Sequence, residues 1–208
     1  MKGTLLFLTL AFGLLSGIPV WATSATSAQC HTQLISLFKT QYRDQYIYKS
    51  KDCDSNCGRF LNFVELHNLN IDQTNVLIIS KLPRRSSLMT KRNPENWLSP
   101  HNTRSMNTQW SFHSVIESQG HIIDFDYSSK PTVDPINQYF PHMFLPYWKF
   151  FLNMSDKTLS HIYVREIPGV VFRQRFQEQA IEGFRNWEEL DKYPFVTVED
   201  YLKSKNKF

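Results

Sequence analysis

Residues 110–126 read WSFHSVIESQGHIIDFD, and this stretch carries the pattern that decides the fold. Two runs rich in strand-forming residues, 109–117 and 121–127, lie on either side of Ser118-Gln119-Gly120. Strand-like runs separated by a short segment that contains glycine are typical of a β-hairpin. The stretch therefore predicts two antiparallel strands joined by a tight turn.

The two strands of this hairpin carry the residues that suggest chemistry. His113 lies on the first strand, and Asp124 and Asp126 lie on the second. The two aspartates point to the same face, because side chains alternate along a strand. A carboxylate within an apolar strand is costly unless it is paired. We therefore expect one of the two to orient the imidazole of His113, and the spacing alone does not choose between them.

Outside the hairpin, the sequence predicts a mixture of helices and strands. Apolar residues at i, i+3, i+4 and i+7 predict a helix from Cys57 to His67, preceded by three cap-forming residues. Thr197 and Asp200 form a variant of the capping box. The other expected elements are a helical face at 30–39, strands at 75–80 and 161–167, a long loop at 83–108, a proline-broken aromatic segment at 131–148 and a final helix at 196–208. The expected fold class is α+β.

The beginning of the chain has the pattern of an export signal. Lys2 is followed by an apolar run at 4–15 and by small residues at 22–28, which is the order found in secretory signal peptides. We expect a signal peptide over residues 1–28, with cleavage after Ala22 or after Ala28, and a secreted or periplasmic protein. The alternative is an uncleaved membrane anchor. After cleavage, we expect no stable association with a membrane.

Composition limits the partners of the remaining chain. The net charge is +4 and 14% of the residues are aromatic, which suffices for one domain with an apolar core. Lysine and arginine are scattered, and no nucleic-acid-binding motif accompanies them. We therefore expect no nucleic-acid partner. We also expect a monomer, although the sequence does not fix the oligomeric state.

The cysteines supply a candidate nucleophile. An exported chain usually pairs its cysteines, and Cys30, Cys53 and Cys57 are an odd number. Cys57 opens the predicted helix, where the helix dipole favours a thiolate, and a histidine and an aspartate follow in the order of a Cys-His-Asp hydrolase. The alternative is that Cys57 forms a disulfide with Cys53 or Cys30. The Cys and His spacings do not form a zinc site, and we expect no metal and no cofactor.

Short motifs between Cys57 and Phe176 follow the order of one known family. They are the helix-opening cysteine, Ile78-Ile79-Ser80, Trp97, Trp110-Ser111-Phe112-His113, Ile123-Asp124-Phe125-Asp126, Tyr139-Phe140-Pro141 and Tyr163-Val164-Arg165-Glu166-Ile167. In these motifs the chain resembles the protein N-terminal glutamine amidohydrolases. The resemblance implies a papain-like or transglutaminase-like core, in which a helix bearing the cysteine packs on an antiparallel sheet bearing the histidine and the aspartate.

The same resemblance implies a set of functional residues. The catalytic triad would be Cys57, His113 and Asp124, and Trp97, Trp110 and Asp126 would contact the substrate. The implied activity is hydrolysis of a glutamine side-chain amide in a protein or peptide, with release of ammonia through a cysteine thioester.

Other functions stay open beside this one. Asn56 and Gly58-Arg59 replace the aromatic and acidic residues that flank the family's cysteine, so the glutamine could be N-terminal or internal. One alternative is a papain-like protease or a transglutaminase with the same triad, and another is a secreted, non-enzymatic binding domain with structural cysteines.

The resemblance begins at Cys57, which divides the expected domain from what precedes it. Residues 29–56 would be an N-terminal extension, and residues 57–208 would be the catalytic domain. We expect Cys30 and Cys53 to form a disulfide that tethers this extension, because export passes through an oxidising compartment. The rival pairing, Cys53 with Cys57, would block the nucleophile until it is reduced.

Overall fold

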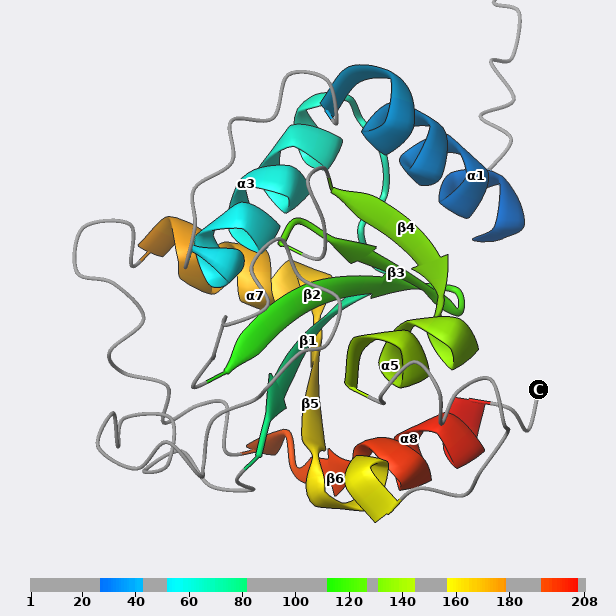
Figure 1. Ribbon diagram of the computed structural model, residues 1–208. Helices are drawn as coiled ribbons and strands as arrows, with labels where there is room; N and C mark the ends of the chain where they lie inside the picture. The colour runs from blue at the N-terminus through cyan, green and yellow to red at the C-terminus, as the bar shows by residue number, and fades with distance from the viewer. Residues whose placement is uncertain are drawn as a thin grey trace, which may run out of the picture.

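The computed structural model describes residues 27–42, 52–81, 112–126, 131–144, 157–178 and 192–205. Its centre is a six-stranded sheet in the order β4-β3-β2-β1-β5-β6, and every neighbouring pair is antiparallel (Figure 1). The strands are β1 (Thr74–Ser80), β2 (His113–Ser118), β3 (His121–Asp124), β4 (Thr132–Pro135), β5 (Tyr163–Pro168) and β6 (Phe195–Thr197). The general α+β class expected from the sequence is confirmed.

Helices cover both faces of the sheet (Figure 1). One face carries α1 (Ser27–Leu37), a π-helical turn (Phe38–Tyr42), α3 (Cys53–Leu66) and α7 (Gly169–Glu178). The other face carries α5 (Ile136–Phe144) and α8 (Val198–Lys205), and a 3-10 turn (Lys157–His161) leads into β5. None of the helices within the described ranges has both the length and the apolar character needed to cross a membrane.

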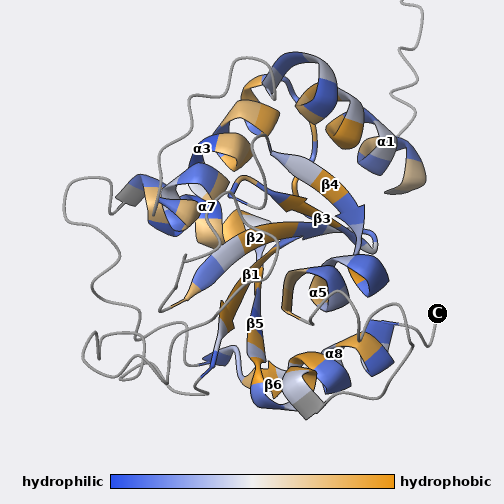
Figure 2. Ribbon diagram, in the orientation of Figure 1, coloured by the Kyte–Doolittle hydropathy of each residue, from blue (hydrophilic) through white to orange (hydrophobic). Residues whose placement is uncertain are grey.

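The side chains of β1 pack into two hydrophobic cores, one on each face of the sheet. Its residues alternate, so Val76 and Ile78 join the cluster under α3, whereas Leu77 and Ile79 join the cluster under α5 and α8. A strand buried on both faces is apolar at nearly every position. Figure 2 shows this hydrophobic character along the middle of the sheet.

The expected hairpin is present. β2 and β3 pair with Ile116 opposite Ile123 and Ser118 opposite His121. The two turn residues, Gln119 and Gly120, both have positive φ angles, 45° and 78°. Two consecutive left-handed residues are what a tight hairpin turn requires, because its twist then matches that of the strands.

Several other expectations can be compared with the structure. The strands expected at 75–80 and 161–167 and the final helix are present, and the Thr197 hydroxyl accepts a 3.1 Å hydrogen bond from the Asp200 N–H. The segment at 131–148 contains β4 and α5, which the sequence reading missed. The signal-peptide segment up to residue 26 and the loop at 83–108 lie outside the described residues. Helix α1 begins at Ser27, so cleavage after Ala28 would remove its first two residues.

The expected extension at 29–56 is part of the core. Leu34, Leu37 and Phe38 are buried in the same cluster as Phe60. The boundary expected after residue 56 falls inside α3, which runs unbroken from Cys53. The described residues 27–42 and 52–56 therefore belong to the same packed unit as the sheet.

Candidate active site

His113 is placed by the end of the sheet. It is the first residue of β2, is only 1% exposed and lies opposite Ile79 of β1. By strand alternation it shares a face with Val115, which packs in the cluster under α5. On β3, Asp124 shares this face with Ile122 of the same cluster. The hairpin therefore brings the imidazole and the carboxylate together on the α5 side of the sheet.

The hydrogen bonds of Asp124 fix its carboxylate. His113 Nε2 lies 2.9 Å from Oδ2 of Asp124, and the Tyr139 hydroxyl donates to the same oxygen at 2.5 Å. The backbone N–H of Asp126 donates to Oδ1 at 2.7 Å. The Asp124 side chain is fully buried, so these three donors replace water around its charge. An ionised carboxylate can only accept hydrogen bonds, so Nε2 of His113 carries the proton in its bond to Asp124. Nδ1 is then the ring nitrogen that takes up a second proton when the imidazole becomes an imidazolium.

Electrostatics favour a protonated imidazole. Burial alone would lower the pKa of His113, but the charge of Asp124, its hydrogen bond and the contact with Cys53 raise the pKa of His113 well above its ordinary value. A buried imidazolium is tolerated because Asp124 pairs with it. The pair is therefore suited to hold a proton taken from a neighbouring group.

The cysteine against this imidazole is Cys53. Burial raises the pKa of the Cys53 thiol, and a hydrogen bond and charge interaction with His113 act in the opposite direction. Cys53 is also the first residue of α3. The predicted start of this helix at Cys57 is wrong, because the helix begins four residues earlier, directly after Asp52.

Cys57 lies one turn into α3 and has a different environment. It is fully buried and belongs to the cluster of Phe60, Val76 and Ile116, on the α3 side of the sheet. Burial, followed by the charges of Cys53 and Asp124, raises the pKa of its thiol well above the ordinary value. Burial and neighbouring negative charge both disfavour a thiolate at Cys57.

The three cysteines are all thiols, which differs from the expected Cys30–Cys53 disulfide. The reason is that Cys30 and Cys53 lie near opposite ends of β2. His31, next to Cys30, has Nδ1 3.0 Å from the Ser118 hydroxyl at one end of that strand, whereas Cys53 lies against His113 at the other end. The two ends of a six-residue strand are about 17 Å apart, and a disulfide needs Cα atoms within about 7 Å.

The start of α3 offers hydrogen-bond donors beside Cys53. The N-cap residue, Asp52, makes no side-chain cap bond, and its carboxylate instead accepts a 3.2 Å bond from Arg59. Arg59 also donates to Oδ1 of Asn56, a fully buried residue one turn from Cys53. The Asn56 amide nitrogen has no hydrogen-bond partner among the described residues. The first backbone N–H groups of a helix point outwards and are available to an anion.

The same site also contains the ligand types of a metal centre. One ligand atom each from His113, Asp124 and Asp126 lie within 4.8 Å of one another. A metal ion bound through Nε2 of His113 would have to displace the proton that this nitrogen shares with Asp124. The arrangement as it stands is that of an imidazole oriented by a carboxylate, with Asp126 beside it.

The other expected site residues have mixed outcomes. Asp126 is 5% exposed and faces the His113–Asp124 pair, whereas Trp97 and Trp110 lie outside the described residues. Tyr139 belongs to one of the motifs of the family resemblance, but the sequence predicted no role for it beside Asp124. The sequence reading also assigned Cys53 to a disulfide, although the Cys-x-x-x-Cys spacing puts both cysteines on one helix face.

A comparison with protein-family models and with curated proteins found no match to this chain.

Proposed function

We propose that this chain is a cysteine-dependent hydrolase of glutamine side-chain amides, with Cys53 in the role first expected of Cys57. The observation that carries the proposal is the sequence of contacts from Cys53 to His113 and from His113 to Asp124. A nucleophile, a base within reach and a third group that orients the base are the elements of a catalytic triad. Here they come from a helix start and two neighbouring strands.

The first chemical step would be attack by sulfur. His113 takes the proton from the Cys53 thiol, and its raised pKa keeps that proton on the ring, so the reactive form is a thiolate–imidazolium pair. The thiolate attacks the amide carbon of glutamine. The oxygen that becomes negative would accept hydrogen bonds from the backbone at the start of α3, including the N–H of Cys53.

The second half of the reaction uses the same proton. His113 donates it to the leaving nitrogen, and ammonia departs with formation of a thioester. Water, deprotonated by the now neutral imidazole, then attacks the thioester carbon. The carbon–sulfur bond breaks, which releases glutamate and restores the thiolate–imidazolium pair of Cys53 and His113. Asp124 keeps the imidazole in one tautomer and orientation throughout, and Tyr139 keeps Asp124 in place.

The fold is compatible with a papain-like or transglutaminase-like core. α3 carries the cysteine and packs against β2 of an antiparallel sheet that carries the histidine and the aspartate. This arrangement supports the family proposal, while the choice of glutamine as substrate rests on the sequence resemblance. A secreted protein acting on an exported or host protein is part of the same proposal.

The test is incubation with glutamine-bearing peptides, some with a free amino terminus and some blocked. We expect ammonia release and a deamidated peptide with the unmodified chain, and neither product with Cys53→Ala. A cut peptide would instead support a protease, and a cross-linked product a transglutaminase. The absence of all three products, with Cys53 unreactive towards thiol reagents, would favour a binding domain.

A further inference from the structure

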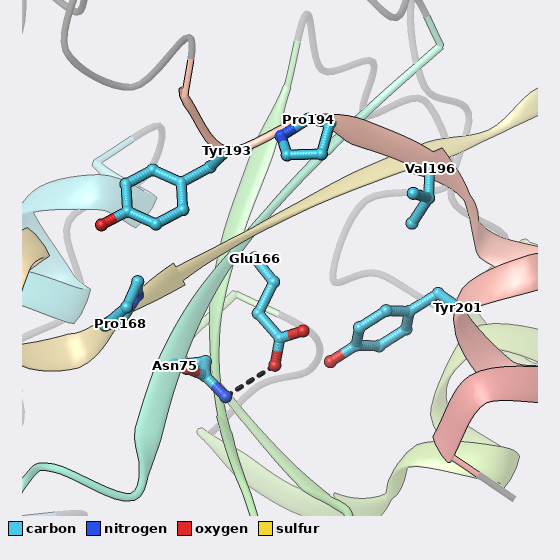
Figure 3. Close-up of a pocket in the computed structure, with 7 residues that line it drawn as sticks. All are labelled: Asn75, Glu166, Pro168, Tyr193, Pro194, Val196 and Tyr201. Carbon is cyan, nitrogen blue, oxygen red and sulfur yellow. Dashed lines mark hydrogen bonds between the residues drawn. The ribbon is translucent and has the colours of Figure 1, made fainter. Parts of the chain in front are cut away.

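Two asparagines of this protein differ in how their side-chain amides are used. Asn75, on β1, donates from Nδ2 to Glu117 Oε2 at 2.9 Å and to Glu166 Oε1 at 2.6 Å, and Figure 3 shows the second of these bonds. Asn56, on α3, is fully buried, and its Nδ2 has no hydrogen-bond partner among the described residues. A buried donor without an acceptor is costly. The Asn56 amide nitrogen therefore calls for an explanation.

The orientation of the Asn56 amide is fixed by Arg59. An arginine side chain can only donate hydrogen bonds, so the atom of Asn56 that Arg59 contacts is Oδ1. Arg59 is itself held by Asp52 at 3.2 Å and by the Tyr42 side chain. The amide cannot turn over without losing its bond to Arg59, and Nδ2 therefore faces away from that residue.

The side of the amide that carries Nδ2 faces Cys53. Successive residues of an α-helix are about 100° apart around its axis. Cys53 therefore lies on one side of Asn56, and Asp52 and Arg59 lie on the other side. Helical side chains also lean towards the N-terminus, which places the Asn56 amide over the first turn of α3. Nδ2 is therefore directed to the space beside the Cys53 side chain and the start of the helix.

The burial of Asn56 matches the depth at which a substrate would react. Cys53 is 8% exposed and His113 is 1% exposed, so a carbonyl group attacked by Cys53 has to enter a covered space beside them. The backbone N–H of Cys53, the first residue of α3, has no acceptor within the helix. Hydrogen-bond donors that converge on an oxygen in a water-excluded site stabilise the negative charge that develops on it. One backbone N–H and one side-chain N–H are available here.

We propose that Nδ2 of Asn56 is a donor of the oxyanion hole and acts together with the backbone N–H of Cys53. This inference rests on the proposed function, because it takes Cys53 as the nucleophile. As the sulfur bonds to the carbonyl carbon, the π electron pair moves onto the carbonyl oxygen, which then accepts from both donors. The pair returns to form the thioester carbonyl when the bond to the leaving nitrogen breaks. Arg59 is a positioning residue, since it contacts the amide of Asn56.

The test compares two reactions of the Cys53 thiol in the full chain. p-Nitrophenyl acetate acylates a thiol through a tetrahedral oxyanion, whereas iodoacetamide alkylates it by displacement of iodide and forms no oxyanion. Acylation is measured as p-nitrophenolate release in excess of that from Cys53→Ala, and alkylation by peptide mapping. Asn56→Leu replaces the amide by an apolar group of similar size. We expect it to slow acylation about 10²-fold and to leave alkylation unchanged.

A second asparagine of α3 provides the matched control. Oδ1 of Asn62 also accepts a hydrogen bond from an arginine, Arg173, at 3.2 Å. Asn62→Leu should change neither reaction. Should Asn56→Leu fail to fold in urea unfolding, Asn56→Asp takes its place, because it keeps the size and the bond to Arg59 and removes the N–H donor. Its added charge acts on the thiolate in both reactions, so the ratio of acylation to alkylation should still fall.

The outcomes separate this inference from the proposed function. An unchanged ratio of acylation to alkylation in the Asn56 variant would overturn the inference and leave Cys53 as the nucleophile. Absence of Cys53-dependent acylation in the unmodified chain would overturn both. Glutamine peptides are tested in parallel, and we expect Asn56→Leu to lower kcat with little change in KM. A reduced acylation ratio without ammonia release from any glutamine peptide would support the oxyanion hole and overturn only glutamine as the substrate.

Discussion

Replacing Asp124 by asparagine tests the electrostatic centre of the site. The carboxylate accepts from His113 and Tyr139 on one oxygen and from the Asp126 N–H on the other. An asparagine has one acceptor and one NH₂ group, so in either orientation the NH₂ faces a donor. A buried donor left without an acceptor costs about 1–3 kcal/mol. Loss of the charge also removes the partner of the His113 imidazolium.

Loss of the Asp124 charge makes the destabilisation caused by Asp124→Asn depend on pH. The folded-state pKa of His113 is raised above its unfolded value, so this contribution to stability is fully present below the unfolded pKa of about 6.5. It declines as the pH rises and is lost once the pH passes the folded pKa. We therefore expect the difference in unfolding free energy between the unmodified chain and Asp124→Asn to be largest near pH 6 and to shrink towards pH 9.

The assay is urea unfolding at a series of pH values, combined with ammonia release from a glutamine peptide. Asp124→Asn should reduce the rate about 10²–10⁴-fold, because an amide favours the wrong imidazole tautomer. Asp126→Asn is the matched control and should cost much less activity. A stability difference that stays constant or grows with pH would refute the reasoning, and a larger rate loss for Asp126→Asn would move the orienting role to that residue.

Two further substitutions test positions that support the site. Tyr139→Phe removes one hydrogen-bond donor to Asp124. We expect the free energy of unfolding to fall by about 1–3 kcal/mol and the rate of ammonia release by about tenfold or less, because His113 keeps its bond to Asp124. Unfolding and rate measurements check this, and a complete loss of activity in a folded variant would contradict it. Gly58→Ala places a methyl group against the Phe176 ring where α3 meets α7, and we expect a loss of about 1–3 kcal/mol by thermal unfolding; an unchanged melting temperature would show that the ring moves aside.

The hairpin could be predicted because its signals are local. Glycine at the turn and alternation around His113, Asp124 and Asp126 specify which side chains share a face. The start of α3 could not be placed, because periodicity is blurred where several cap-forming residues follow one another. Cap-forming residues occupy positions 52 and 54–56, on both sides of Cys53. The observed start of α3 moves the candidate nucleophile by one turn, from Cys57 to Cys53.

The helix around Tyr139 could not be predicted from the sequence, because it contains a proline. Pro141 lies inside α5, although proline ordinarily ends a helix. Burial of Tyr139, Phe140 and Phe144 against the sheet offsets that local cost. Packing of this kind depends on distant strands, and no pattern within residues 131–148 reveals it. The donor to Asp124 therefore became visible only in the fold.

The most direct test of the central claim is whether His113 activates Cys53. The measurement is the rate of iodoacetamide labelling at pH 8, followed by peptide mapping, in the unmodified chain and in His113→Gln. Cys30 serves as the internal control, because it lies on α1 near the other end of β2. We expect His113→Gln to slow labelling of Cys53 about tenfold, since His113 lowers the pKa of that thiol, while labelling of Cys30 is unchanged. Unchanged labelling of Cys53, or labelling of Cys57 in its place, would contradict the account.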